Sequence, residues 1–320
     1  MSLPRIAVVG AGSFGKNHIR ILHESPDAQL SGVFDSDLTR AATAAAERNC
    51  PVFTSLSELA AASDGAVVAT PTVTHSEIGC QLMELGCDVL IEKPIAHDQA
   101  AGQALVDTAA RTGRILQVGH LERFNPAVAA LSKVVTTPLF FEVHRLSEFS
   151  PRSLDVDVVL DLMIHDLDII LSLTGKMPEE IRAAGIHILS ERVDIANVRL
   201  QFPGGCVANL TASRISTERV RKLRLFQPHE YISLDYSRQD GARFSVGDNR
   251  KISFMPLAAT KSEPLRLEVE NFIECIRTRQ QPRVTGTQAL AALQVARDIL
   301  VKIEEHSNVV AQSLHATGTP

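Results

Sequence analysis

Aromatic side chains are scarce in this sequence, and it has no excess of positive charge. Among 320 residues there is no tryptophan, there are two tyrosines, and the formal net charge is −5. Proteins that hold nucleic acids generally use aromatic stacking platforms and basic surfaces. The composition therefore predicts that the protein does not bind nucleic acid.

A long apolar segment and an ordered set of metal or disulfide ligands are also missing. No stretch reaches the roughly 18 consecutive apolar residues of a membrane-spanning helix, and the N-terminus leads into a strand pattern without a signal peptide. The five cysteines contain no C-x-x-C pair, and the eleven histidines show no H-x-H or H-x-x-x-H spacing. These absences predict a cytoplasmic protein with reduced thiols, no metal site and no membrane partner.

The pattern of apolar residues divides the chain into two parts. Because 320 residues exceed the size at which a single hydrophobic core stops growing, two domains are expected. At the beginning of the chain, strand-like runs alternate with helical patterns, which is typical of a parallel sheet flanked by helices. We predict a doubly wound Rossmann domain over residues 1–122. Its strands are expected at Ile6–Val9, Leu30–Phe34, Gly65–Ala69, Val89–Glu92 and Ile115–Gly119.

After Pro126 the apolar residues alternate along runs that are separated by turn residues, which is typical of an antiparallel sheet. We predict an α+β domain with an open, mostly antiparallel sheet over residues 123–305, and a short, frayed polar tail over 306–320. The fold class is α/β. The runs are Phe140–Phe149, Ile181–Leu189, Ala196–Phe202, Cys206–Ile215, Arg221–Phe226 and Glu230–Tyr236, and helices are expected at Asp157–Leu173, Pro264–Arg279 and Thr287–Glu305.

The most informative segment is a glycine-rich turn that follows the first apolar run. The order strand, G-x-G-x-x-G, helix, strand and acid is the fingerprint of a dinucleotide-binding βαβ unit. Gly10 permits the tight turn, Gly12 lets the backbone approach a pyrophosphate, and Gly15 lets helix and strand pack closely. We assign to cofactor binding the segment residues Gly10, Gly12, Ser13, Phe14 and Gly15.

The acid at the end of the second strand selects the cofactor. Asp35 follows Gly15 by twenty residues, and no arginine or lysine occurs after it until Arg40. A carboxylate there accepts hydrogen bonds from the ribose hydroxyls of NAD and repels the 2′-phosphate of NADP. The sequence therefore predicts NAD.

Glu92-Lys93-Pro94 is the first candidate for chemistry, because it follows the predicted strand Val89–Glu92. Ligands of open parallel sheets bind beyond the carboxyl ends of the strands. A lysine at that edge can hydrogen-bond a substrate hydroxyl, and we assign Lys93 a catalytic role and Glu92 and Lys93 contacts with the cofactor. The alternative is a solvated lysine beside a glutamate.

The second candidate is a helical segment in which Asp161, His165 and Asp168 have the spacing i, i+4 and i+7 and so share one face. A histidine between two carboxylates is a tuned imidazole, because one acid fixes its tautomer and raises its basicity. The alternative is an exposed polar stripe on an amphipathic helix.

Two further segments contain polar residues at expected ligand positions. His120, Arg123 and Asn125 lie at the domain junction and can bind substrate hydroxyls or phosphate, although a hinge with a capping asparagine explains Asn125 equally well. After another strand, we assign cofactor contacts to Thr70, Pro71 and His75. In that segment Thr74 is also expected to begin a helix with a capping box to Glu77, and His75 taken alone is typical of a structural histidine.

Together these motifs resemble the glucose–fructose oxidoreductase / inositol dehydrogenase / MocA family over nearly the whole chain. The resemblance implies oxidation of a sugar or polyol hydroxyl with a nicotinamide cofactor, and an open sheet that mediates homodimers or homotetramers. It implies that Lys93 is the catalytic lysine, Asp161 a substrate-binding acid and His165 the proton acceptor. One departure is Met163, where the family commonly has glycine. The segments that carry the resemblance are GAGSFG, Thr70–His75, Glu92–Pro94, Arg123–Pro126 and Asp161–Asp168.

Within the family, the sequence around the junction and the histidine is similar to that of dehydrogenases that oxidise the 3-hydroxyl of a UDP-linked N-acetylhexosamine. A group of basic residues would then bind the diphosphate. A solvated strand edge explains this cluster of positive charge equally well. Its members are Arg214, Arg219, Arg221, Lys222 and Arg224. The alternatives are a dehydrogenase of a free, inositol-like polyol or monosaccharide and a non-catalytic NAD-binding regulator; a regulator would not need Lys93, Asp161 and His165 together.

Overall fold

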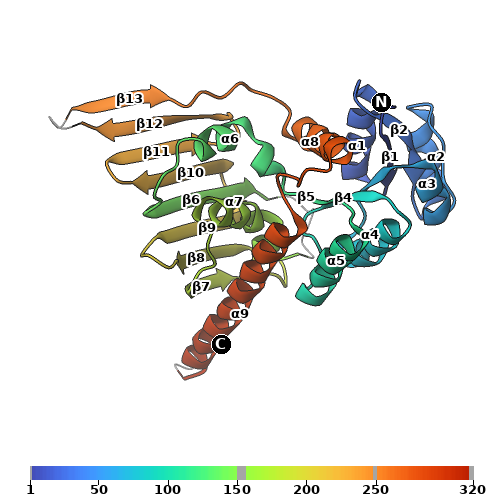
Figure 1. Ribbon diagram of the computed structural model, residues 1–320. Coiled ribbons are helices and arrows are strands. Elements are labelled where there is room, and N and C mark those ends of the chain that lie inside the picture. Colours follow the sequence, from blue (N-terminus) through green and yellow to red (C-terminus); the bar gives the residue numbers. More distant parts are fainter. Residues whose placement is uncertain (1, 150–155, 248–250, 317–320) are drawn as a thin grey trace. The chain divides into compact units, whose positions relative to one another are not determined.

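The computed structural model describes residues 2–149, 156–247 and 251–316 (Figure 1). The chain folds into two compact units. The first comprises Met1–Phe124 and Ser262–Leu290, and the second comprises Asn125–Lys261 and Ala291–Pro320. The sequence predicted a boundary after residue 122 but did not predict that residues 262–290 return to the first unit.

The first unit is built on a parallel sheet whose described strands have the order β2-β1-β3-β4-β5. Strands β1, β3, β4 and β5 are apolar runs that are almost completely buried, as expected for a sheet covered by helices on both faces. The strands are β1 Arg5–Val9, β2 Gln29–Phe34, β3 Gly65–Val68, β4 Asp88–Glu92 and β5 Leu116–Gly119. The predicted Rossmann architecture is confirmed.

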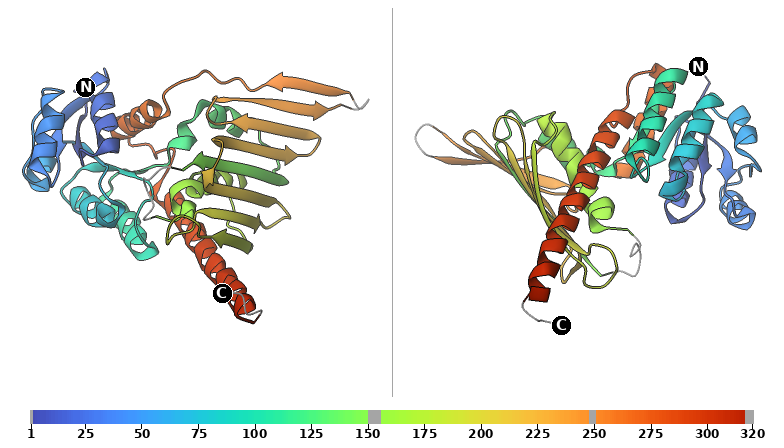
Figure 2. Two further views of the ribbon diagram at one scale, coloured as in Figure 1. Left: turned by 180° about the vertical axis from the view of Figure 1, so that it is seen from behind. Right: turned by 90° about the horizontal axis from the view of Figure 1, so that it is seen from below.

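The described helices of this unit alternate with its strands, except for α8, which comes from the distant segment 262–290. Phe272 of α8 is completely buried and packs in one core with Ile19 of α1, and the left view of Figure 2 shows α8 (orange) beside α1 (dark blue). The elements are α1 Ser13–Glu24, α2 Leu38–Ala46, α3 Leu56–Ala62, α4 His75–Glu84, α5 Gln99–Thr112 and α8 Pro264–Thr278, with short 3-10 turns η1 Thr72–Thr74 and η2 Leu121–Phe124.

The second unit contains an open sheet with the described strand order β13-β12-β11-β10-β6-β9-β8-β7 (Figure 1). β6 and β9 pair in parallel and the other neighbours pair antiparallel, so the predicted mostly antiparallel sheet is confirmed. The strands are β6 Phe140–Glu148, β7 Glu180–Ile186, β8 Ile195–Gln201, β9 Val207–Ser216, β10 Val220–Gln227, β11 Glu230–Asp235, β12 Asp240–Val246 and β13 Ile252–Pro256. The sequence did not predict β12 and β13.

One face of the open sheet packs against helices, and alternate strand residues form a core with them. The helices are α6 Pro126–Ser132, α7 Ile164–Thr174 and α9 Gly286–Ala316, and a π-helical turn, η3 Val159–Met163, precedes α7. α9 continues to Ala316, whereas the sequence predicted a frayed tail from His306. In the described ranges, no helix has the length and apolar character needed to cross a bilayer.

A buried ion pair joins α7 to the sheet. Arg145 of β6 donates from Nε and Nη2 to the two carboxylate oxygens of Asp166, at 2.6 and 2.9 Å. Both side chains are at most 2% exposed, and the Arg145 guanidinium also lies 5.0 Å from the centre of the Tyr236 ring. Such a bidentate contact is directional. It fixes the rotation of α7, on which His165 precedes Asp166.

Candidate active site

Residues predicted to bind the cofactor or the substrate follow the carboxyl ends of the strands of the first unit. Gly10 follows β1, Asp35 follows β2, Thr70 lies just beyond β3, Lys93 follows β4 and His120 follows β5. In a parallel sheet these ends lie at one edge. The fold therefore gathers at this edge residues that are widely separated in the sequence.

The glycine-rich turn has the space that a dinucleotide requires. Gly10 has φ +96°, and a Cβ atom there would lie 2.5 Å from the carbonyl oxygen of Ala69. A Cβ at Gly15 would lie 1.8 Å from the carbonyl oxygen of Gly10, which explains the close packing of α1 on the turn. At Gly12, by contrast, no described atom lies within 4 Å of that position. A pyrophosphate can therefore approach the N-terminus of α1, where Ser13 and Phe14 are exposed.

Asp35 is fixed by backbone groups at the end of β2. Its carboxylate accepts hydrogen bonds from the N–H of Ala11 at 2.7 Å and of Asp37 at 2.9 Å, and it is 5% exposed. The Arg40 guanidinium lies 3.7 Å from one carboxylate oxygen. These contacts orient a negative charge beside the glycine-rich turn, as the sequence analysis expected of an NAD-binding acid.

Replacement of Asp35 by asparagine is expected to reduce the preference for NAD over NADP by about tenfold or more, because the amide does not repel a 2′-phosphate. Asparagine retains an oxygen that can accept from the Ala11 N–H, so the turn should stay folded. Steady-state kcat/KM for the two cofactors measures the change, with the exposed Asp27→Asn as a matched control. An unchanged cofactor ratio would show that Asp35 does not select the cofactor.

His75 connects two loops at the strand edge. It is 1% exposed, and its Nδ1 and Nε2 atoms each lie 3.0 Å from a backbone oxygen, of Pro94 and Thr70 respectively. Burial lowers the pKa of the imidazole, despite the two carbonyl contacts. A neutral imidazole donates to one of these carbonyl oxygens and only contacts the other. In the structure His75 thus holds the Thr70 loop against the Pro94 turn.

The capping box predicted at Thr74 is wrong. α4 begins at His75, and the Thr74 side chain makes no hydrogen bond to the first backbone N–H groups of the helix. Its hydroxyl instead donates to the hydroxyl of Thr70 and to the carbonyl of Pro71, each at 2.8 Å. These bonds stabilise the loop that carries Thr70 and Pro71.

The turn that carries Lys93 is held by a contact that the sequence analysis missed. Glu92 Oε1 lies 2.6 Å from Nε2 of His18, which is completely buried on α1. A Cβ at Gly119 would lie 3.0 Å from the other carboxylate oxygen, so the glycine leaves room for Glu92. Lys93 itself is half-buried and is joined to Pro94 by a cis peptide. The sequence feature that could have indicated this contact is His18, three residues after Gly15.

Two of the residues predicted at the domain junction, Arg123 and Asn125, form hydrogen bonds within the protein. Asn125 accepts from the N–H of Ala127 at 3.1 Å and donates to the carbonyl of Tyr236 at 3.0 Å, so it caps α6. Arg123 donates to the carbonyl of Arg283 at 3.1 Å, and His120 is 1% exposed. For Asn125 the structure thus shows the capping role that the sequence analysis left open.

The second unit positions Asp161, His165 and Asp168, but not on one regular helix. Asp161 lies in the π-helical turn η3, and the other two lie on α7. The helix that the sequence predicted over Asp157–Leu173 is therefore not a regular α-helix throughout. Asp161 and His165 are partly exposed, Asp168 is 2% exposed, and Met163 is buried in the core. Single π-turns of this kind occur frequently at functional sites.

The basic group of the second unit does not form one solvated strand edge. Arg214 is 6% exposed, its Nε lies 3.7 Å from Asp194, and it donates to the carbonyl of Val193 at 3.3 Å. Arg224 donates to Glu142 at 3.0 Å on the exposed face. Arg221 of β10 is partly buried and lies opposite Arg145 of β6 in the register of the sheet. Arg214 is therefore a structural arginine.

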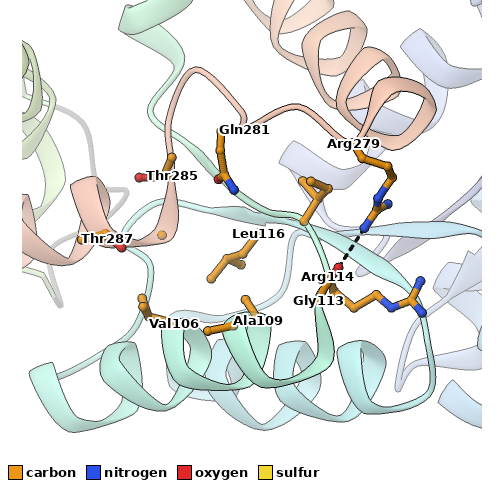
Figure 3. A pocket seen from close by; sticks show the side chains of 12 residues that line it. Val106, Ala109, Gly113, Arg114, Leu116, Arg279, Gln281, Thr285 and Thr287 are labelled. Carbon is orange, nitrogen blue, oxygen red and sulfur yellow. Dashed lines mark hydrogen bonds between the residues drawn. The ribbon is translucent and has the colours of Figure 1, made fainter.

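A cavity of about 430 Å³ in the first unit lies at the opposite edge of the sheet (Figure 3). It is lined by Ala109 of α5 and by Leu116, the first residue of β5. Arg279 crosses one side and donates to the carbonyl of Gly113 at 2.9 Å. Because it adjoins the N-terminal end of β5, this cavity is separate from the edge that holds Gly10, Asp35 and Lys93.

Comparisons with known proteins cover nearly the whole chain. Residues 4–120 match the oxidoreductase family with an NAD-binding Rossmann fold, and residues 134–227 match the GFO/IDH/MocA C-terminal domain. The UDP-N-acetylglucosamine 3-dehydrogenase of Acidithiobacillus ferrooxidans is 35% identical, over 94% of this chain and 97% of the relative. A crystal form of that protein has a TM-score of 0.91 at 34% identity, covering 95% of this chain and 99% of the other.

The inositol 2-dehydrogenase of Rhizobium meliloti is 26% identical over 95% of this chain and 98% of the relative. These similarities confirm the predicted fold class, the oxidoreductase class and the NAD cofactor. The chain belongs to the GFO/IDH/MocA family of oxidoreductases, whose Rossmann domain binds NAD.

Proposed function

We propose that the protein oxidises the 3-hydroxyl of UDP-N-acetylglucosamine to a ketone with NAD. The observation that carries this proposal is the similarity to a dehydrogenase of that substrate, which extends over both units at 35% identity. The first unit supports the use of NAD, because its strand edge combines the glycine-rich turn, the fixed carboxylate of Asp35 and Lys93. A non-catalytic regulator is disfavoured because such a protein would not need Lys93, Asp161 and His165 for proton transfer.

In this proposal His165 accepts the proton of the reacting hydroxyl, and Lys93 donates a hydrogen bond to the same oxygen. Asp161 binds the sugar, and Asp161 or Asp168 keeps the imidazole in the basic tautomer. A positioned general base contributes roughly 10²–10⁴-fold to such a reaction. When bound, NAD supplies the acceptor for the hydride that leaves the carbinol carbon. His120 and Arg123 are proposed to contact the substrate as well.

The contacts of the basic group reduce the number of its residues that could bind a diphosphate. Arg214 is committed to Asp194 and to backbone carbonyls, and Arg224 is paired with Glu142. We propose that the diphosphate is bound by the other members of the group, Arg219, Arg221 and Lys222. Replacing Arg221 with glutamine should raise KM for a UDP-sugar and leave KM for NAD unchanged. An unchanged KM for the sugar would favour a substrate without a diphosphate.

The experiment that tests the proposed function is a spectrophotometric NAD-reduction assay with four compounds side by side. UDP-N-acetylglucosamine is expected to support turnover, and free N-acetylglucosamine, UDP-glucose and myo-inositol are expected to support much less. Preferred oxidation of myo-inositol would establish the alternative, a free-polyol dehydrogenase, which the similarity to inositol 2-dehydrogenase favours. NAD binding without turnover of any sugar would revive the regulator.

We also propose that the protein forms a homodimer or homotetramer through the face of the open sheet that carries an aromatic row. Ring centres are 5.0 Å apart for Phe226 and Tyr231, 5.3 Å for Tyr231 and Phe244, and 5.2 Å for Phe244 and Phe254. Phe254 is 60% exposed, and rows of exposed apolar side chains mark interaction surfaces. Sedimentation velocity should show a dimer or tetramer that Phe254→Asp weakens; a monomer at micromolar concentration would contradict the proposal.

A further inference from the structure

Three buried side chains from separate segments of the first unit meet behind the Lys93 turn. They are His18 of α1, Glu92 of β4 and Glu268 of α8, called here the buried trio. One nitrogen or oxygen atom of each lies within 4.8 Å of one such atom of the other two. His18 and Glu268 are completely buried, and the Glu92 side chain is 12% exposed. The trio connects the returning helix α8 to the residue that precedes Lys93.

The two carboxylates of the trio have different surroundings. Glu92 has the His18 imidazole at 2.6 Å. Neither carboxylate oxygen of Glu268 has a hydrogen-bond partner among the residues that the structure describes. Gln117 of β5 donates to the backbone carbonyl of Glu268, not to its side chain, at 2.9 Å. An isolated carboxylate in such a place is very unfavourable, and a proton neutralises it.

Burial, and secondly the charge of Glu92, raise the pKa of the Glu268 carboxyl well above its ordinary value. A protonated carboxyl is a hydrogen-bond donor as well as an acceptor. Because one oxygen of Glu268 lies within 4.8 Å of one oxygen of Glu92, a single water molecule would bridge the two groups.

Most other charged groups on the elements around Glu268 have partners elsewhere or lie at the surface, whereas Glu122 of η2 is buried. On α1, Arg20 and Glu24 pair with Glu263 and Arg266 respectively, at the beginning of α8. The remaining charged residues of these elements are Lys16 and His23 on α1, Asp88 on β4, Glu122 and Arg123 on η2, and Glu270, Glu274 and Arg277 on α8. Asp88 is paired with Arg279.

We propose that Glu268 is a positioning residue that remains a neutral carboxylic acid at neutral pH and, by bonding to Glu92, holds the turn that carries Lys93. The role of the turn in catalysis rests on the proposed function; the charge state of Glu268 does not. The fold makes this contact possible because α8, although it follows the open sheet in the chain, belongs to the first unit. There it brings Glu268 close to Glu92 of β4.

The protonation state is tested by infrared difference spectroscopy at pH 7, comparing wild type with Glu268→Gln. The exposed Glu270→Gln, two residues along α8, is the matched control. A protonated-carboxyl C=O band should be present in wild type and in the control and absent from Glu268→Gln. Its absence from wild type would overturn the proposal, as would one tightly bound divalent metal ion per chain by elemental analysis, because the cation would replace the protons.

The same state predicts how stability depends on pH. Because the folded chain holds a proton that the unfolded chain releases, stability must fall as the pH rises from the ordinary carboxyl pKa towards the raised folded value. Relative to Glu268→Gln, the folding equilibrium constant of wild type should fall by up to tenfold per pH unit in that window. Urea unfolding at several pH values measures this, and equal slopes in the two proteins would contradict a neutral Glu268.

Kinetics test the positioning role separately. Glu268→Ala should lower kcat by about tenfold or more with little change in KM for NAD, since a displaced catalytic group impairs the reaction more than binding. Glu268→Gln, which retains a donor, should recover most of kcat. Wild-type kcat in Glu268→Ala would overturn positioning. If wild type oxidises no sugar, the proposed function fails, while the infrared and stability measurements still decide the state of Glu268.

Discussion

Lys93→Met is expected to lower kcat for the oxidation of UDP-N-acetylglucosamine by at least about 10²-fold. The methionine side chain retains the length and apolar stem of lysine but cannot donate a hydrogen bond to the reacting oxygen. NAD binding should persist, because Gly10, Gly12 and Asp35 remain in place. Stopped-flow absorbance gives kcat, and calorimetry gives the dissociation constant for NAD.

The control for this variant is Lys302→Met on α9, where the lysine is exposed and pairs with Glu305. Its kcat should equal that of wild type. Loss of NAD binding in Lys93→Met would mean that the lysine serves the cofactor rather than the reacting hydroxyl. A near-normal rate in that variant would remove Lys93 from the mechanism altogether.

His165→Asn is expected to lower kcat by roughly 10²–10⁴-fold, the usual contribution of a general base. Asparagine is polar and similar in shape, so α7 should remain attached through Arg145 and Asp166. The rate that remains should rise with pH, because hydroxide can replace a missing base. The measurement is kcat as a function of pH at saturating sugar and NAD.

His187→Asn provides the comparison, since His187 is an exposed histidine of the same unit. This control should retain the wild-type pH profile. If His165→Asn also retained that profile and rate, another group would have to accept the proton, and Asp161 would be the next candidate. A loss confined to KM for the sugar would instead indicate that His165 binds substrate without taking its proton.

The Rossmann half of the fold was predictable from sequence because its determinants are local. Buried parallel strands are continuous apolar runs, and the turn at Gly10 requires a backbone conformation that glycine adopts easily. Asp35 and Lys93 could be placed at the sheet edge for the same reason, since each directly follows such a run. Strands β12 and β13 escaped prediction because β13 is exposed and β12 is half-buried, without an alternation of buried and exposed residues.

The contacts that depend on distant segments were not predictable. Nothing in the apolar pattern of α8 indicates that Glu268 lies in the first unit near His18 and Glu92, because that placement follows from packing on α1. The π-helical turn before α7 is likewise a departure from the ordinary helical period that a spacing of i and i+4 assumes. Asn125 shows the converse, because a residue suited to ligand binding is used to cap a helix.

The most direct test of the central claim is to follow deuterium from carbon 3 of UDP-N-acetylglucosamine labelled at that position. In a single turnover with unlabelled NAD, mass spectrometry should find the deuterium on the reduced cofactor and none on the 3-keto sugar. Substrate labelled at carbon 4 should transfer no deuterium to the cofactor. Unlabelled reduced cofactor from the carbon-3 substrate, or no reduced cofactor at all, would contradict the proposed reaction.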